Sequence, residues 1–262
     1  MFLKKNCILF VIMVVLLMAN ISSAGWLWWT NGTTNRQWAD AGNWTAFPTS
    51  SDDVVVGTYD TTGPILNSNE TGYANWMHIT DTTSTGSKVT INGGTLNVND
   101  HLFLGQWDSG AKGILEIDSG VVNTNLLMCG GDTSGTVACE GLLQMDGGQI
   151  NISWLLAVAG GYNGTDGAGV GHIQLDGGTI NVTGGGGLVM SDNGSIDITD
   201  GALILNGEIT NIASYGNVTA FGGEGSFVYN YADGRTTITA IPEPATLILI
   251  GLGSLLLKRK KR

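Results

Sequence analysis

Basic residues are scarce in the body of this chain of 262 residues. Between residues 25 and 240 there are only four, Arg36, Lys88, Lys112 and Arg235, against 21 acidic residues, which gives a net charge of −17. A polyanion of this size repels phosphate backbones, so we expect no nucleic-acid partner. Divalent cations and neutral or cationic glycans remain compatible with this charge.

Residues typical of catalytic and metal sites are also few. The three histidines have no metal-ligand spacing and no G-x-S-x-G elbow is present, so we predict neither a metal site nor a serine nucleophile. The scattered basic residues supply no base for a polysaccharide lyase. Of the equivalent strand positions Glu116, Gln144 and Gln174, only the first could belong to the carboxylate pair of a glycosidase. We therefore predict no enzyme activity, with a polysaccharide lyase or hydrolase as the alternative.

Cysteine occurs three times, and Cys7 lies in the apolar N-terminal segment. Cys129 and Cys139 belong to the part of the chain that we expect to be exported, where a disulfide can persist. Two interpretations stay open for this pair: a disulfide, or two small buried thiols.

The first 24 residues have the three parts of a signal peptide. Lys4 and Lys5 precede an apolar run from Cys7 to Met18, and small residues follow up to Ala24. This order predicts an apolar signal helix and cleavage between Ala24 and Gly25, and hence export. An uncleaved membrane anchor is the alternative.

Proline is rare, with four residues, while glycine occurs 41 times and no amphipathic helix is evident between the two ends. One strand-and-turn pattern is repeated, with apolar residues five and three positions before an anchor glycine and two positions after it. The anchors are Gly94, Gly120, Gly148, Gly178 and Gly201, separated by 26, 28, 30 and 23 residues. The pattern predicts an all-β parallel β-helix of about 23–30 residues per rung, stacked at about 4.8 Å. An antiparallel sandwich or jelly roll is the alternative.

Polar residues also recur in register with the anchors. Asparagines lie three positions after four of them, at Asn97, Asn123, Asn151 and Asn181. In a stack these amides would form a ladder, and the alternative is solvated polarity near a turn. Aspartates lie two positions before three anchors, at Asp118, Asp146 and Asp176. Together with Asp132 and Asp166 in glycine-rich loops they give a weak indication of calcium, and otherwise no cofactor is predicted.

Five of the eight tryptophans, at positions 26, 28, 29, 38 and 44, lie at the start of the mature chain. The segment from Gln37 to Val56 resembles the start of exported bacterial β-solenoid proteins. We interpret the tryptophans as a cap on the open end of the stack, with a glycan contact at Trp38 and Trp44 as the functional alternative. The predicted division is a cap with the first rungs over 25–82, and repeats with a C-terminal cap over 83–240.

The tail over 241–262 has three parts. Pro242, Glu243 and Pro244 form an extended triplet, and the 13 apolar residues 245–257 predict a short transmembrane helix. A basic cluster ends the chain and is expected to stay in the cytoplasm: Lys258, Arg259, Lys260, Lys261 and Arg262.

This tail is similar to the PEP-CTERM sorting signal of Gram-negative bacteria. The resemblance implies recognition by exosortase, processing at or near the triplet, and a membrane anchor that is at least transient. It also implies an association with exopolysaccharide or biofilm matrix, at the cell surface, the outer membrane or in the extracellular matrix. We therefore expect a structural or adhesive surface protein.

Overall fold

The computed structural model describes residues 25–57, 62–80, 86–106, 108–131, 137–162 and 168–243. The signal helix predicted for residues 1–24 and the transmembrane helix predicted for residues 245–257 lie outside these ranges. Within them, no helix is long and apolar enough to cross a membrane. The helical pieces there are short 3-10 turns, namely η1 (Ala41–Asn43), η2 (Ile212–Tyr215) and η3 (Phe221–Gly223).

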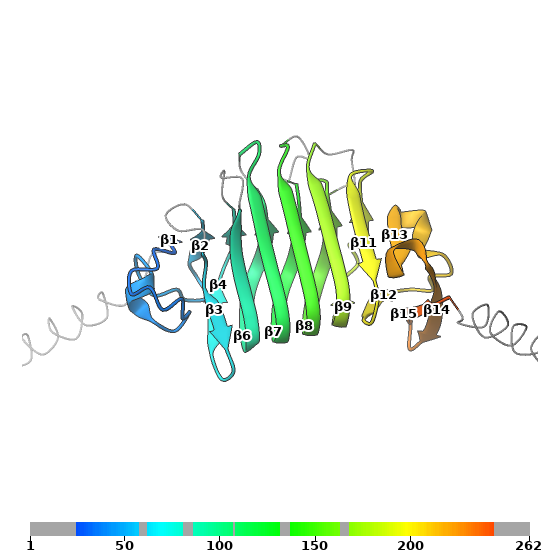
Figure 1. Cartoon of the computed structure of the whole chain (residues 1–262), viewed down its shortest axis with the longest axis horizontal. Coiled ribbons are helices and arrows are strands. Elements are labelled where there is room, and N and C mark those ends of the chain that lie inside the picture. The colour runs from blue at the N-terminus through cyan, green and yellow to red at the C-terminus, as the bar shows by residue number, and fades with distance from the viewer. Residues whose placement is uncertain are drawn as a thin grey trace, which may run out of the picture.

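The described chain is an all-β solenoid of about seven turns, which confirms the predicted fold class (Figure 1). Its centre consists of long, bent strands that pair in parallel, each with the next. They are β6 (Ser87–Leu104), β7 (Lys112–Cys129), β8 (Glu140–Val158) and β9 (Val170–Val182). Asn97 pairs with Asn123, Asn123 with Asn151, and Asn151 with Asn181, so the register follows the spacing of the anchor glycines. Parallel pairing rules out the sandwich alternative for this region.

Each rung has three faces, as the pairing of β6 with the preceding turn shows. Three separate short strands pair with successive parts of β6: β3 (Ile65–Asn67), β4 (Thr71–Ala74) and β5 (Met77–Ile79). The turn before this one contributes β2 (Asp53–Val56), which pairs with β5, and β1 (Trp26–Trp28), one turn earlier again, pairs with β2. After β9 the rungs continue as β10 (Gly187–Met190), β11 (Gly194–Ile198), β12 (Ala202–Asn206) and β13 (Asn217–Ala220).

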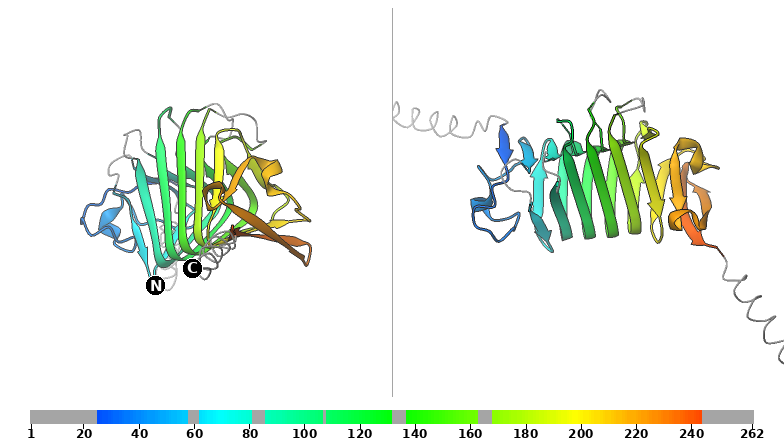
Figure 2. Two further views of the ribbon diagram at one scale, coloured as in Figure 1. Left: turned by 45° about the vertical axis from the view of Figure 1, so that its right-hand side comes forward. Right: turned by 45° about the horizontal axis from the view of Figure 1, so that its top comes forward.

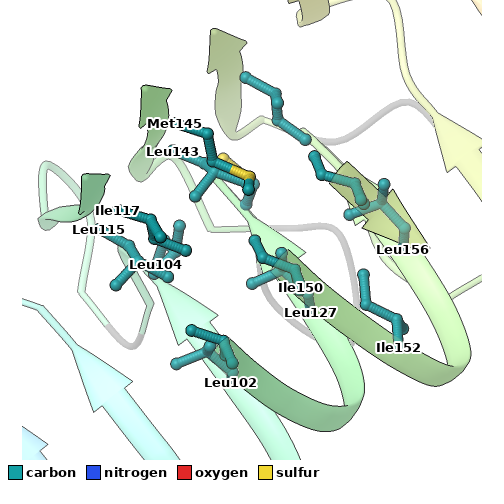
Figure 3. Packing of buried hydrophobic residues seen from close by; sticks show 14 of the residues in the cluster. Leu102, Leu104, Leu115, Ile117, Leu127, Leu143, Met145, Ile150, Ile152 and Leu156 are labelled. Atoms are coloured by element: carbon teal, nitrogen blue, oxygen red, sulfur yellow. The ribbon is translucent and has the colours of Figure 1, made fainter. Parts of the chain in front are cut away.

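The core fills the interior of the stack with one layer of aliphatic side chains per rung. Figure 3 shows Leu115 and Ile117 of β7 beside Leu143 and Met145 of β8, all pointing inward. These four side chains are at most 1% exposed. They alternate with polar residues because successive side chains of a strand point to opposite faces. Burial of each such side chain contributes roughly 1.5–3 kcal/mol.

The anchor glycines form a column at one corner of the stack. Gly120, Gly148 and Gly178 have φ angles of 99°, 74° and 76°, which other residues adopt only with strain. A Cβ atom on each would also lie 2.3–2.7 Å from the carbonyl oxygen of the equivalent glycine in the preceding rung. Glycine is therefore required at this corner for two reasons: the positive φ angle, and the close approach of the preceding rung, which leaves no room for a Cβ atom.

Tryptophan rings close the N-terminal end of the core. Trp29 and Trp38 are fully buried and Trp44 is 5% exposed. The Trp44 ring lies 5.0 Å from Trp29 and 4.7 Å from Trp38, in edge-to-face contacts, and its Nε1 donates to the Trp38 carbonyl at 3.0 Å. The rings of Trp38 and Trp44 thus have no face open to a glycan, because both pack inside the cap.

An antiparallel hairpin closes the C-terminal end. It consists of β14 (Gly225–Ala232) and β15 (Arg235–Pro242), and β15 also pairs with β12 in antiparallel fashion. Phe227 and Tyr229 pack against the core, while Tyr231 is exposed. Figure 2 shows this hairpin at the end of the stack opposite the tryptophan cap.

The glycine column predicts a specific stability difference. Gly148→Ala should cost about 2–5 kcal/mol, because it combines left-handed strain with a Cβ atom 2.7 Å from the Gly120 oxygen. Gly234→Ala is the matched control, since its φ of 76° is similar and a Cβ atom there meets nothing within 4 Å. This control should cost only about 1–2 kcal/mol. Equal losses in melting temperature for the two variants would contradict the packing argument.

Candidate functional site

Four asparagines form a ladder along the outside of the solenoid. Asn123 Nδ2 donates to Asn97 Oδ1 at 2.9 Å, Asn151 donates to Asn123 at 2.9 Å, and Asn181 donates to Asn151 at 3.4 Å. All four side chains are half-buried. The predicted ladder is thus present, and it faces outward because the interleaved residues, such as Leu96 and Val98, fill the core.

The two ends of the ladder have different partners. At the C-terminal end, the Arg235 guanidinium donates to Asn181 Oδ1. At the N-terminal end, Tyr73 is paired in register with Asn97, and its side chain is 42% exposed. The row therefore begins with an exposed aromatic ring and ends with a guanidinium group that completes the chain of amides.

A groove of about 320 Å³ lies beside the ladder, at the corner that follows it in each rung. A second polar row crosses this corner: Ser153 Oγ donates to Asn125 Oδ1 at 3.0 Å, and Asn125 donates to Asp100 at 3.2 Å. The groove is lined by uncharged residues, namely Asn97, Val98, Asn99, Asn123, Thr124, Asn125, Asn151, Ile152, Ser153 and Thr183.

Aromatic side chains lie just beyond this corner. Trp154, which directly follows Ser153, is 37% exposed, and its ring lies 5.6 Å from that of Tyr162. The Tyr162 hydroxyl is 2.9 Å from His101 Nε2, and the His101 ring lies 4.6 Å from Trp76. Burial raises the pKa of Tyr162, and the negative charge of the nearby Asp100 carboxylate raises it further, so the Tyr162 hydroxyl stays protonated. Trp76 and Tyr162 pack against an apolar patch on the third face, formed by Phe103, Leu126, Met128, Leu155 and Ala157.

This combination suits a long, neutral, polyhydroxylated ligand. Asn123, Asn151 and Asn181 each use one of their two N–H donors on the preceding asparagine, and Asn97 only accepts, which leaves hydrogen-bonding capacity toward the groove. The same amide recurs on each rung, at a strand spacing of about 4.8 Å. A repeating polymer lying along the solenoid axis would therefore meet a repeating set of polar groups, and Trp154 directly follows a residue of the groove lining.

The aligned carboxylates lie on another part of the surface. Asp118, Asp146 and Asp176 line a cavity of about 260 Å³ together with Glu116 and Gln144. Within the described residues, no group of three or more His, Cys, Asp or Glu side chains is arranged to hold a metal ion. The two other residues considered for calcium, Asp132 and Asp166, lie outside those residues.

All four basic residues of the solenoid already have partners. Lys88 lies 2.9 Å from Glu116, and Lys112 lies 2.6 Å from Glu140. The Arg36 guanidinium donates to the Gly63 carbonyl at 3.0 Å, and that of Arg235 donates to the ladder. A lyase base would therefore have to leave one of these contacts.

Cys129 and Cys139 are both buried and are present as thiols, so the structure has the second of the two arrangements considered for them. Burial raises the pKa of Cys129 to about 12, because the thiolate would lose its hydration. At neutral pH the sulfur is therefore protonated and poorly reactive.

The predicted processing sites lie at the edges of the described chain. Gly25 is its first residue, and the Gly25 carbonyl accepts from the Asp53 N–H at 3.0 Å. Ala24, Pro244 and the basic cluster lie outside the described residues. Pro242 and Glu243 are described, and both are exposed at the end of β15.

A scan against protein-family models matches residues 240–262 to the PEP-CTERM protein-sorting motif. The chain carries a PEP-CTERM sorting motif. The motif indicates export in a Gram-negative bacterium, processing by exosortase and a membrane-associated C-terminus. This match confirms the sorting motif that was predicted from the Pro242–Pro244 triplet, the apolar run and the basic cluster. The match begins at Ala240, one residue before the predicted start of the tail. Searches of curated proteins and of solved structures gave no match.

Part of the site has no signal in the sequence. The repeat predicts the asparagine row but not Ser153 and Trp154, which belong to an irregular corner. At this corner β7 has one residue fewer than β6 and β8, and the register shifts there. The repeat therefore gave no signal for these two residues.

Each hydrogen bond of the ladder is donated toward the N-terminal end. A pair of aspartate variants tests this direction, and a pair of alanine variants gives the uncharged comparison. Asn123→Asp should cost about 1–3 kcal/mol, because a carboxylate cannot donate to Asn97 and leaves that amide oxygen without its bond. Asn97→Asp is the control: this side chain only accepts from Asn123, and a carboxylate accepts as well. Asn123→Ala and Asn97→Ala give the uncharged comparison. Equal losses in urea unfolding for the two aspartate variants would contradict the direction of the ladder.

His78 predicts a pH dependence of stability. It is fully buried and stacked 4.8 Å from Phe103, and burial lowers its pKa from 6.5 to about 3. Below pH 6.5 the unfolded chain therefore binds a proton at His78 that the folded chain does not bind. The contribution of neutral His78 to the free energy of unfolding is complete above pH 6.5 and is lost as the pH falls toward 3. Between pH 7 and pH 5, wild type should lose about 2 kcal/mol more than His78→Phe.

The control for this experiment is Phe103→Leu, which disturbs the same ring stack but removes no titrating group. Its unfolding free energy should follow the pH dependence of wild type. Urea unfolding at both pH values measures all three proteins, and a pH dependence of His78→Phe identical to that of wild type would refute the assignment.

Proposed function

We propose that this protein is a non-enzymatic component of the cell surface or extracellular matrix that binds a neutral glycan chain along its asparagine groove. The single observation that supports this proposal is the uncharged groove, in which amides and hydroxyls repeat along the solenoid axis. The partly exposed Trp154 directly follows Ser153 of the groove lining. Export, indicated by the PEP-CTERM motif, supports this proposal because an exported groove is accessible to extracellular polysaccharide.

The charge of the molecule narrows the ligand class. With a net charge of −17 over residues 25–240, the solenoid repels acidic polysaccharides at low ionic strength. The groove itself contains no ionisable side chain among its lining residues. Neutral hexose polymers avoid this repulsion and can use the amide donors and acceptors. A series of weak contacts along one polymer gives useful overall affinity, because linked contacts act together.

A polysaccharide hydrolase is the second candidate, and the acidic cavity is the observation that favours it. Glu116, Asp118, Asp146 and Asp176 share that cavity, and glycosidases use two carboxyl groups. Two features favour the binding function instead. Glu116 is held by Lys88, and the aspartates recur at the turn before each anchor glycine, where turn chemistry accounts for them.

Glycan binding can be tested with Trp154→Ala. On a glycan array, wild type should retain neutral hexose polymers, and Trp154→Ala should bind them about tenfold more weakly through loss of the stacking surface, equivalent to roughly 1.4 kcal/mol. Tyr231→Ala is the matched control, since it removes an exposed aromatic ring at the C-terminal hairpin. An equal loss in both variants would contradict the proposed site.

A reducing-end release assay on the same polymers separates the two candidate functions. Binding without release supports the adhesive function. Release that disappears in Asp146→Asn would replace it with the hydrolase.

A further inference from the structure

The sorting motif begins inside the last strand of the folded solenoid, without a spacer. The matched motif starts at Ala240, whereas β15 extends to Pro242. The Glu243 N–H also donates to the Glu224 carbonyl, at 3.2 Å. The first two residues of the triplet are therefore held by the beginning of β14.

The pairing also accommodates the first proline of the triplet. Because Glu243 donates to Glu224, these two residues form a hydrogen-bonded pair of an antiparallel ladder. Its neighbour, Pro242 with Gly225, is then a non-hydrogen-bonded pair, where a missing N–H costs no ladder bond. We call these two residue pairs the terminal pairs.

A surface cavity of about 480 Å³ adjoins the terminal pairs. It is lined by Phe221, Gly223, Glu224, Pro242 and Glu243. The Glu224 and Glu243 carboxylates both lie on this cavity, and no basic side chain lines it among the residues that the structure describes, so their repulsion opposes the closed arrangement. The hydrogen bond from the Glu243 N–H to the Glu224 carbonyl is therefore opposed by the repulsion between like charges, which weakens the terminal pairs.

We propose that the terminal pairs must open before the sorting enzyme can process the triplet. Proteins that bind an extended peptide often satisfy its backbone groups by strand addition, and we expect an enzyme that processes the triplet to do the same. The Glu243 N–H cannot donate to Glu224 and to an enzyme at the same time. Opening of the terminal pairs would therefore limit processing at the sorting motif, and it is independent of glycan binding in the asparagine groove.

The proposal can be tested by locking the end of the hairpin with a disulfide in the full chain, expressed in its native cells. Ser226 and Ile241 lie opposite each other in a hydrogen-bonded pair, whose Cα separation of about 5.5 Å suits a disulfide. In Ser226→Cys/Ile241→Cys the processed fraction should fall at least tenfold, and a reductant should restore it. The readout is the mass of the C-terminus, and the melting temperature of the purified chain reports on folding.

Two matched variants separate the lock from other effects. Asn230→Cys/Thr237→Cys places a disulfide at an equivalent pair on the same face of the hairpin, farther from the motif, and should be processed like wild type. Ser226→Cys/Ile241→Ser changes the same two positions but cannot form the bridge, and it should also be processed like wild type. A Gly-Ser spacer inserted between Ala240 and Ile241 should increase the rate of processing.

Three results would overturn the proposal. They are normal processing of the bridged Ser226→Cys/Ile241→Cys chain, equal inhibition by the bridge at positions 230 and 237, and no faster processing with the spacer.

Discussion

The described solenoid depends on the parallel stacking of its rungs. A single rung of some 23–30 residues exposes both its backbone groups and its aliphatic side chains, and only the next rung can satisfy them. The pairing of β6 through β9 satisfies the backbone, and one layer of buried side chains per rung forms the core. The anchor glycines permit this approach, because a Cβ atom at Gly120, Gly148 or Gly178 would collide with the rung below.

Stacking also creates the candidate site. An asparagine three positions after an anchor is only a polar residue near a turn when it occurs once. Repeated in register, it becomes a ladder in which Asn123 both donates to Asn97 and accepts from Asn151. Because the ladder runs along the axis, it fits a ligand that repeats along that axis as well. The two ends differ, with buried tryptophans at one and a hairpin that leads directly into the sorting motif at the other.

Much of this organisation could be predicted from local patterns. The five anchor glycines and the alternating apolar residues determine an all-β repeat with rungs of 26, 28, 30 and 23 residues, because a strand can bury only every second side chain. The triplet at 242–244, the apolar run and the basic cluster determine the sorting motif, because its parts are contiguous in the chain. Neither prediction needs contacts between residues distant in sequence.

Other features were decided only by the tertiary structure. Whether Trp38 and Trp44 contact solvent or core depended on how the N-terminal segment folds over the open end, where both rings are enclosed. The groove lies at the corner that precedes Trp154, where successive rungs differ in length, so the sequence repeat does not predict it. The contact between Glu243 and Glu224 joins the sorting motif to the fold through a hairpin. Local sequence determines periodicity, whereas exposure and cross-rung contacts depend on what the neighbouring rung presents.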